Sequence, residues 1–247
     1  MHRPLLIPEF APQSGVMLTW PHAATDWQTS LPQADAVYVD LALAISRHES
    51  LLVICHNASL RNHVQDLLDS AGIAPAAVRY CLAPVNDTWV RDYGPLSVQL
   101  VRGTQLLDFT FDGWGGKYPS GLDNSVSQTL QADGVFGRTG YQRLPLVLEG
   151  GSIDTDGAGT LLTTSRCLLK SGRNPGLDKQ QLERVLAEYL GTSHVLWLDQ
   201  GELAGDDTDG HVDMLARFCS PGVIAYTRCD NPAEAHYREL AAMERQL

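Results

Sequence analysis

The sequence predicts an α/β fold that repeats one unit, a β-hairpin followed by a helix and a strand. Three segments carry this prediction, because each places a carboxylate beside glycine at a strand end: residues 86–95, 148–151 and 209–213. Their acidic and histidine residues recur at intervals of about 60 residues, the size of one structural repeat. Repeats arranged around an axis bring equivalent strand ends to the centre, as in propellers. We therefore expect the three segments to meet.

A predicted β-hairpin follows each of these segments. The hairpins cover 96–111, 152–164 and 214–227, with turns at Arg102-Gly103, Asp156-Gly157 and Ser220-Pro221-Gly222. A doubly wound parallel sheet is the competing architecture. It predicts alternating strands and helices without a hairpin in each unit, so the hairpins argue against it.

Helical patterns lie between the hairpins and the strands. Apolar residues recur at helical spacing in 60–71, with Ser59 as the expected N-cap, and again in 182–190. Asp178 is the expected cap of the second helix, and Gly191 lies just past its end.

Short apolar runs predict buried strands at 51–54, 146–148 and 195–198, and an earlier helix is expected from about Gln33 to His48.

The last segment begins as a helix should, with Asn231 as cap and Pro232 at the first position. It has no stop signal before Leu247, and the repeat predicts a further strand after it. We expect the sequence to be a C-terminally truncated piece of a longer protein; a natural C-terminal helix is the alternative.

Length and composition predict one globular domain over residues 1–247. Hydrophobic residues make up 44% and charged residues 19%, which suits a packed core and excludes wholesale disorder. The net charge of −11 argues against nucleic acid and anionic membranes as partners and suits a cationic ligand. The start of the sequence does not resemble a signal peptide, and no apolar run approaches the roughly 20 residues of a membrane helix. A cytoplasmic location is expected.

The five cysteines are odd in number and show no Cys-x-x-Cys spacing, which disfavours a disulfide framework or a structural zinc site. Cys55, Cys81 and Cys167 lie in apolar runs typical of core cysteines. A reducing compartment fits this pattern.

His211 and Asp213 are the strongest candidates for chemistry. They are two residues apart on a predicted strand, so both side chains would leave the same face, about 7 Å apart at the backbone. The preceding loop contains Asp206, Asp207 and Asp209. Their negative charges repel one another, and cations or hydrogen bonds would have to offset this repulsion. A solvated acidic turn is the favoured interpretation of the loop, and a metal site is the alternative.

Asp92 and Glu149 are the other candidates. On extended backbone, Arg91 and Asp92 would point to opposite faces, and the bend at Gly94-Pro95 would leave Asp92 at a rim. The glycines after Glu149 permit close backbone approach. Taken alone, Glu149 is as compatible with a hydrogen-bond anchor as with a catalytic group.

Together these motifs resemble the guanidino-group-modifying deiminases, most closely the agmatine deiminase and Porphyromonas-type peptidylarginine deiminase family. The matching stretches begin at Trp89 (WVRDYGP), Phe111 (FDGWGGKY), Leu148 (LEGGSI), Cys167 (CLL), Arg173 (RNP) and Gly205 (GDDTDGHVD). The resemblance covers essentially the whole sequence in order. It implies a pseudo-fivefold α/β propeller of ββαβ modules, of which this sequence would supply roughly four.

The resemblance also implies roles. Asp92 and Asp213 would clamp the guanidinium, His211 would act as general acid and base, Glu149 would orient His211, and Trp89 would line the pocket. Carboxylates suit a guanidinium because it is planar, always charged and a rigid fork of donors. The family uses a cysteine thiolate that forms a covalent thiouronium adduct, which expels ammonia and is then hydrolysed. No metal or other cofactor is implied.

That nucleophile lies in a glycine-rich segment near the C-terminus of the family, which no cysteine here matches. Cys219 would lie about 20 Å from Asp213 along a strand, and Cys229 lacks a glycine-rich context. We therefore expect this chain to bind guanidines poorly and to be inactive as given.

The leading functional hypothesis is the conversion of agmatine to N-carbamoylputrescine and ammonia by the full-length protein, in putrescine and polyamine biosynthesis. The expected partner is a small cationic guanidine, and a homo-oligomer is compatible with the sequence. Three alternatives stay open: a peptidyl-arginine deiminase of the same family, a metal-dependent hydrolase, and a non-catalytic fragment that only binds cations. The metal ligands would come from the cluster Asp206, Asp207, Asp209, His211 and Asp213.

Overall fold

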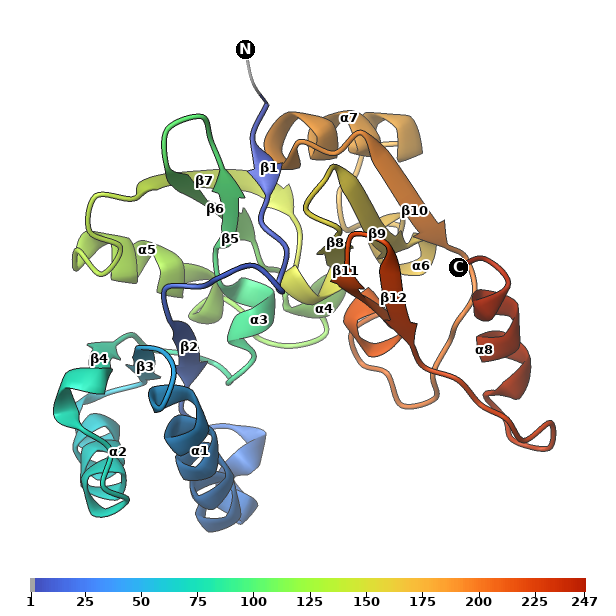
Figure 1. The fold of residues 1–247 in the computed structure, drawn as a ribbon. Coiled ribbons are helices and arrows are strands. Elements are labelled where there is room, and N and C mark those ends of the chain that lie inside the picture. Colours follow the sequence, from blue (N-terminus) through green and yellow to red (C-terminus); the bar gives the residue numbers. More distant parts are fainter. Residues whose placement is uncertain (1–2) are drawn as a thin grey trace. The chain divides into compact units, whose positions relative to one another are not determined.

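The computed structural model describes residues 3–247 and confirms an α/β chain (Figure 1). The chain divides into two compact units. Unit 1 contains the described part of Met1–Ala11 with Arg91–Tyr118 and Arg138–Leu247; unit 2 contains Pro12–Val90 and Pro119–Gly137. No helix of the described residues is long and apolar enough to cross a membrane.

Unit 2 is built on a three-stranded parallel sheet. Its strands are β2 (Val16–Thr19), β3 (Leu51–Cys55) and β4 (Val78–Leu82), with β3 in the middle. The helices α1 (Leu31–Ser46) and α2 (Ala58–Ser70) make the crossovers between them. Both pairings are parallel, so this sheet has the strand–helix alternation of the competing architecture, and the predicted hairpin unit does not describe it.

The shorter helices of unit 2 are η1 (Asp26–Ser30), η2 (Pro75–Ala77), η3 (Asp123–Ser125) and α5 (Val126–Ala132). The core of the unit contains Trp20, Val53 and Val64, none of which has exposed surface.

The predicted cap of α2 is wrong by two residues. Asn57, in extended conformation, accepts the hydrogen bond of the Leu60 amide at 2.9 Å, and Ser59 lies inside the first turn. Both residue types suit an N-cap, but the backbone is still extended only at Asn57. The earlier helix was expected from about Gln33; α1 begins two residues before it.

Unit 1 contains the three predicted hairpins, and all three are antiparallel. Their strands are β5 (Leu96–Gln99) with β6 (Thr104–Thr110), β8 (Ile153–Thr155) with β9 (Thr160–Thr164), and β11 (Ala216–Ser220) with β12 (Val223–Tyr226). After the first two hairpins a strand returns parallel to the second hairpin strand. These strands are β7 (Gly140–Val147) on β6 and β10 (His194–Leu198) on β9.

The repeat of a hairpin and a returning parallel strand is thereby confirmed for these two sheets; the helix between β9 and β10 lies in unit 1, whereas α5, the helix between β6 and β7, is counted in unit 2. The short strand β1 (Leu5–Leu6) extends the first sheet by pairing with β5.

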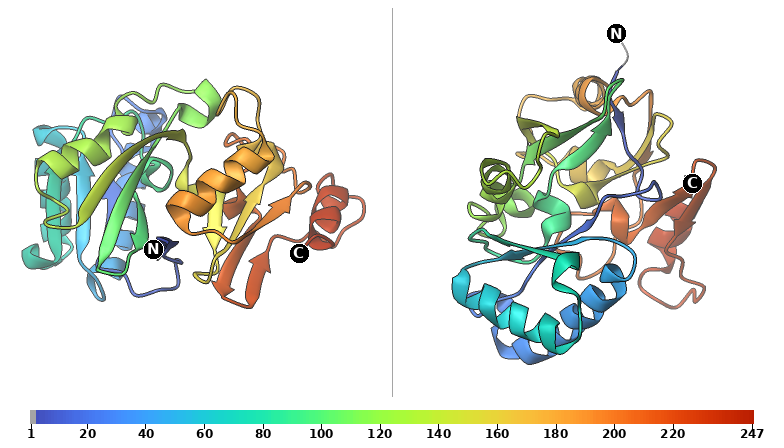
Figure 2. Two further views of the ribbon diagram at one scale, coloured as in Figure 1. Left: turned by 90° about the horizontal axis from the view of Figure 1, so that it is seen from above. Right: turned by 60° about the vertical axis from the view of Figure 1, so that its left-hand side comes forward.

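Helix α7 (Lys179–Leu190) connects β9 to β10 and packs its apolar face into the largest core of unit 1 (Figure 2). Leu182, Leu186 and Leu190 are buried there. Both predicted ends are confirmed. Asp178 forms a capping box with Gln181, and Gly191 adopts a left-handed conformation with φ 70°. A short helix, α6 (Ser165–Leu168), precedes α7.

The last helix starts later than the sequence predicted. Helix α8 runs over Tyr237–Glu244, and Asn231 closes a separate turn by accepting the amide of Ala233 at 3.1 Å. An Asn-Pro pair favours turns as well as helix starts, which explains the error. Leu240 and Met243 of α8 are buried against the core beneath β11.

Replacing Asp178 by alanine tests the cap of α7. Asp178→Ala removes the carboxylate that accepts the hydrogen bond of the Gln181 amide and leaves the backbone amide of residue 178 as donor to Gln181, so we expect the free energy of unfolding to fall by about 1 kcal/mol. Urea unfolding followed by circular dichroism measures the change. Asp178→Asn keeps an acceptor and should differ from the wild type by only a few tenths of a kcal/mol; equal losses in both variants would show that the cap does not matter.

Candidate functional site

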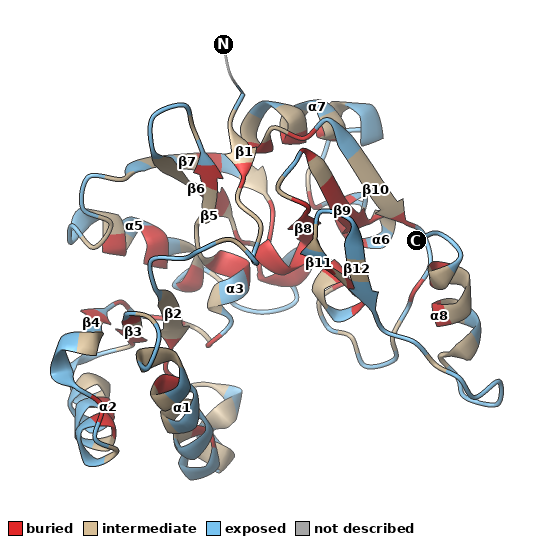
Figure 3. Ribbon diagram, in the orientation of Figure 1, coloured by how far each residue is buried: buried red, intermediate tan, exposed pale blue. Residues whose placement is uncertain are grey.

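Three turns of unit 1 bring the predicted site residues together. Asp92 lies in α3 (Val90–Tyr93), Glu149 directly precedes η4 (Gly150–Ser152), and His211 directly precedes η5 (Val212–Met214). The His211 Nε2 atom lies 3.1 Å from Glu149 Oε2, and its Nδ1 atom lies 3.5 Å from Asp92 Oδ1. All three side chains are buried, and Figure 3 shows that all residues of the neighbouring strand β8 are buried as well.

The local backbone differs from the sequence prediction at two of these turns. Residues 211–213 were expected on a strand and residues 89–95 as extended chain, but both form single helical turns. Asp209 and Gly210 adopt left-handed conformations with φ 70° and 87°, and they turn the chain into η5. His211 and Asp213 still serve one site, although not through the alternation of a strand.

Gly151 marks the point on which the site converges. A Cβ atom at this position would lie 2.5 Å from Asp213 Oδ2, 2.6 Å from His211 Nδ1 and 2.7 Å from Asp92 Oδ1. Three polar atoms from two other segments, 86–95 and 209–213, therefore face the Gly151 Cα, and only a glycine fits there. The Gly151 amide also donates a hydrogen bond to Asp92 Oδ1 at 3.0 Å.

Asp92 accepts a second hydrogen bond, from Trp114, a residue to which the sequence analysis assigned no role. The indole Nε1 of Trp114 donates to Asp92 Oδ2 at 3.1 Å. Trp114 lies in α4 (Gly113–Gly116) with φ 58°, a conformation that costs free energy outside glycine, and its glycine neighbours also have positive φ. This turn aims the indole at the carboxylate. The WGGK pattern was visible in the sequence, but nothing local indicated the partner.

Burial controls the protonation of the acidic groups. It raises the pKa values of Asp92 and Asp213, and the charge of His211 opposes both shifts. Burial also acts to raise the pKa of Glu149, but the hydrogen bond from His211 and the charge of Arg173 reverse it, so the Glu149 pKa is lowered. Glu149 is therefore the carboxylate of the site that is held in its ionised form.

His211 is held in the protonated form. Burial alone lowers its pKa, but interactions with Cys167, Glu149 and Asp92 outweigh burial and raise the pKa to about 10. An imidazolium donates from both nitrogens, which suits carboxylates on its two sides.

Two further residues of the cluster were not assigned from the sequence. Cys167, expected as a core cysteine, is fully buried, but its sulfur also lies within 4.8 Å of ligand atoms of Glu149 and His211. Arg173, whose side chain has no exposed surface, forms an ion pair with Glu149 Oε2. The sequence signal for Arg173 was the RNP motif, which named the residue but not its partner.

The acidic loop does not present free carboxylates. Asp206 accepts hydrogen bonds from Thr208 and Gly210, and Asp209 pairs with Lys117 at 2.7 Å and with Lys170. These contacts disfavour the metal-dependent alternative, because the expected ligands already have protein partners. Glu149, Cys167 and His211 could together contact a metal ion, but the guanidinium of Arg173 beside Glu149 opposes a second cation.

Trp89, expected in the pocket, belongs to unit 2. Its ring is half exposed, and its Nε1 atom donates to Asp87 Oδ2 at 3.1 Å. Trp27 donates to the other oxygen of the same carboxylate, so Asp87 fixes two indoles.

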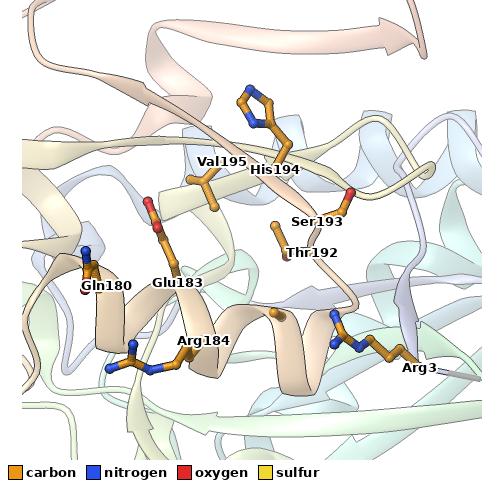
Figure 4. A pocket seen from close by; sticks show the side chains of 9 residues that line it. Arg3, Gln180, Glu183, Arg184, Thr192, Ser193, His194 and Val195 are labelled. Atoms are coloured by element: carbon orange, nitrogen blue, oxygen red, sulfur yellow. The ribbon is translucent and has the colours of Figure 1, made fainter. Parts of the chain in front are cut away.

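A separate cavity of about 580 Å³ in unit 1 lies against α7 and β10 (Figure 4). Its lining includes Arg3, Arg184, Glu183 and His194. None of the candidate site residues contributes to the lining: Asp92, Glu149, His211 and Asp213.

Comparison with known proteins establishes the class of the chain. Residues 5–247 match the model of the Porphyromonas-type peptidyl-arginine deiminase family. The chain belongs to this family.

Its relatives include the agmatine deiminase of Pseudomonas syringae pv. tomato, 37% identical over 236 residues that cover 93% of this chain and 61% of that protein. Among solved structures, a C. jejuni agmatine deiminase variant with substrate bound superposes with a TM-score of 0.91 at 34% identity, covering 98% of this chain and 70% of that one. The Enterococcus faecalis agmatine deiminase gives 0.86 at 32% identity, covering 98% and 66%. The chain spans about 62% of the length of the curated relatives it matches.

Replacing Gly151 tests the convergence of the site. In Gly151→Ala the new methyl group must displace Asp92, His211 and Asp213, so we expect a loss of about 1–3 kcal/mol in the free energy of unfolding. Urea unfolding measures it. Gly222→Ala is the matched control, because a Cβ there meets no atom within 4 Å. Equal effects of the two substitutions would contradict the geometry.

The raised pKa of His211 predicts a pH-dependent contribution to stability. Folded His211 binds its proton up to about pH 10, whereas the unfolded side chain releases it near 6.5. The contribution is complete below pH 6.5 and is lost as the pH rises toward 10. We expect the difference in unfolding free energy between the wild type and His211→Gln to shrink from pH 6 to pH 10. The exposed-residue variant His48→Gln is the control, and a difference that does not change with pH would refute the prediction.

Proposed function

We propose that this chain is the guanidinium-binding part of a deiminase that hydrolyses agmatine to N-carbamoylputrescine and ammonia, a step of putrescine and polyamine biosynthesis. One observation carries the proposal: Asp92, Asp213 and His211 face one point at Gly151. Family membership and the relatives named agmatine deiminase support the choice of reaction. We also propose that both units belong to one catalytic domain of propeller type, as the two sheets of unit 1 with a hairpin and a returning parallel strand suggest.

A guanidinium matches the chemistry of this point. It is planar and always charged, and its N–H groups can reach carboxylates on two sides. Asp92 and Asp213 supply those carboxylates, and burial makes their negative charges costly until a cation arrives. The role of Trp89 as an aromatic pocket residue stays a prediction from the family resemblance, since an aromatic face attracts guanidinium.

His211 is the proposed general acid and base. Its Nε2–H is held by Glu149, so the Nδ1 edge faces Asp92 and Gly151. A guanidinium bound between Asp92 and Asp213 would place positive charge beside the imidazolium and lower its pKa toward neutrality. Substrate binding thereby prepares the proton for transfer to the departing nitrogen.

The reaction needs a sulfur nucleophile. A thiolate forms a C–S bond with the guanidinium carbon, and the C–N bond then breaks as His211 gives a proton to the amino nitrogen, which leaves as ammonia. Water, deprotonated by His211, attacks the same carbon. The C–S bond breaks, which releases the ureido product and restores the thiolate.

We propose that none of the five cysteines of this sequence is that nucleophile. Cys55 and Cys81 lie in the sheet of unit 2, where burial raises their pKa values, that of Cys55 to about 12. Cys219 lies on β11, and its thiol donates a hydrogen bond to the backbone carbonyl of Arg217. The thiol of Cys229 likewise donates to a backbone carbonyl, that of Asn231. Cys167 has no exposed surface through which a substrate could reach it. All five are free thiols, which supports a reducing, cytoplasmic location.

Arginine in peptides is the second candidate substrate, because the matching family model carries that description. Parallel assays with agmatine and with benzoyl-arginine amide on the complete gene product would separate the two.

Agmatine titrated into the 247-residue chain tests the guanidinium site. We expect weak, saturable shifts of the His211 ring signals in nuclear magnetic resonance spectra, with a Kd of about 1 mM or weaker. Asp213→Asn should weaken binding by about tenfold or more, since a hydrogen bond to a charged group contributes about 1.5–3 kcal/mol. The same samples should release no ammonia above the blank.

Two controls sharpen this test. Putrescine lacks the guanidinium and should leave His211 unshifted, and Asp199→Asn removes an exposed carboxylate of unit 1 outside the site. Equal shifts with putrescine would disprove the guanidinium site. Sustained ammonia release by this chain would disprove the exclusion of its own cysteines.

A further inference from the structure

Arg173 is the buried charge that the proposed reaction does not use. It lies in the loop between α6 and α7 of unit 1, and its side chain has no exposed surface. Its Nη1 atom donates to Glu149 Oε2, the same oxygen that binds His211 Nε2 at 3.1 Å. A buried guanidinium is costly unless a carboxylate compensates it, so the pairing with Glu149 is the reason it can be there.

The hydrogen bonds of Arg173 do not explain its presence as a structural anchor. Its Nε and Nη2 atoms are buried and have no hydrogen-bond partner among the described residues. An arginine that ties loops together normally uses several of its five donors. Among the described residues Arg173 forms its side-chain hydrogen bond through Nη1 alone, to the carboxylate that binds His211 Nε2.

The second carboxylate near Arg173 has cations of its own. Asp209 Oδ2 lies 3.8 Å from Arg173 Nη2, but Asp209 also pairs with Lys117 and Lys170. The charge of Asp209 is therefore already compensated, and the charge of Arg173 acts on the cluster of Cys167, Glu149 and Asp112, in which Glu149 is its hydrogen-bond partner.

Other groups around Glu149 show why a fixed cation is needed there. Besides His211 and Cys167, the carboxyl of Asp112 approaches Glu149, and Asp92 adds a further negative charge. Burial and then the charge of Glu149 raise the pKa of Asp112, whereas Arg173 lowers it. Without Arg173, the buried Glu149 would compete with these carboxylates for a proton, and a neutral Glu149 would no longer stabilise the imidazolium.

We propose that Arg173 is a positioning residue whose positive charge keeps Glu149 ionised and oriented, so that Glu149 holds His211 with its Nδ1 edge toward Asp92 and Gly151. The proposal rests on the proposed function only for the use of His211 in proton transfer. The electrostatic chain from Arg173 through Glu149 to His211 is a property of unit 1 without any ligand.

The test is the titration of His211 in the 247-residue chain, followed by nuclear magnetic resonance without ligand, with the ring signals assigned by His211→Gln. Arg173→Gln keeps a donor for Glu149 but removes the charge, and we expect it to lower the His211 pKa by about one unit or more. Arg173→Lys keeps the charge and should restore at least half of that shift.

Arg143→Met is the matched control. It removes an arginine that pairs with the buried Asp108 on β6 of the same unit, so the His211 titration should not change. An unchanged His211 pKa in folded Arg173→Gln would overturn the proposal, and so would an equal shift in Arg143→Met. If Arg173→Gln does not fold, Arg173→Lys decides: a His211 pKa within about half a unit of the wild type supports the proposal, and a fall of a unit or more overturns it.

This outcome is separable from the proposed function. Shifts of His211 on addition of agmatine report the guanidinium site, whereas the Arg173 variants are measured in its absence. If either the agmatine titration or the Arg173 experiment gives a negative result, the other can still be interpreted.

Discussion

The structure of unit 1 depends on the cost of gathering negative charge away from water. Asp92 and Glu149 are buried beside Asp213, and each carboxylate needs donors or cations to remain charged there. His211 and Arg173 compensate Glu149 from two sides, and the Gly151 amide and the Trp114 indole compensate Asp92. The remaining negative charge lies at Asp92 and Asp213, where we propose that a flat cation binds.

The backbone around these charges is arranged to bring polar atoms close together. Gly151 leaves room for three of them, and left-handed turns at Trp114 and Asp209 aim an indole and a carboxylate that regular helices or strands would not place there. Asp209, tied to Lys117 and Lys170, fastens the loop before His211 to two other segments of unit 1. Hydrogen bonds and ion pairs thus hold the acidic loop to the rest of unit 1, which argues against both a solvated turn and a metal site.

Local chemistry made much of the fold predictable. The hairpins were found from their turn residues, and both ends of α7 were found from Asp178 and Gly191, because caps and turns are decided within a few residues. The parallel sheet of unit 2 was missed because the repeat was extended to a segment whose pattern lacks a hairpin. Four candidate site residues were named from motifs, but the strand expected at His211 was wrong because Asp209, which turns the chain there, is held by partners distant in sequence. Arg173 could not be assigned a role for the same reason: its partner Glu149 is 24 residues away and only the folded chain brings them together.

The hydrogen bond between Trp114 and Asp92 has a practical consequence. An indole emits light whose colour and intensity depend on the charges around the ring, and here the ring N–H is bonded to the carboxylate that would meet a cation. Trp114 is nearly shielded from water, so we expect its fluorescence to respond to changes at that carboxylate more than to the bulk solvent. If Asp92 binds a guanidinium as proposed, Trp114 reports that binding without any attached dye.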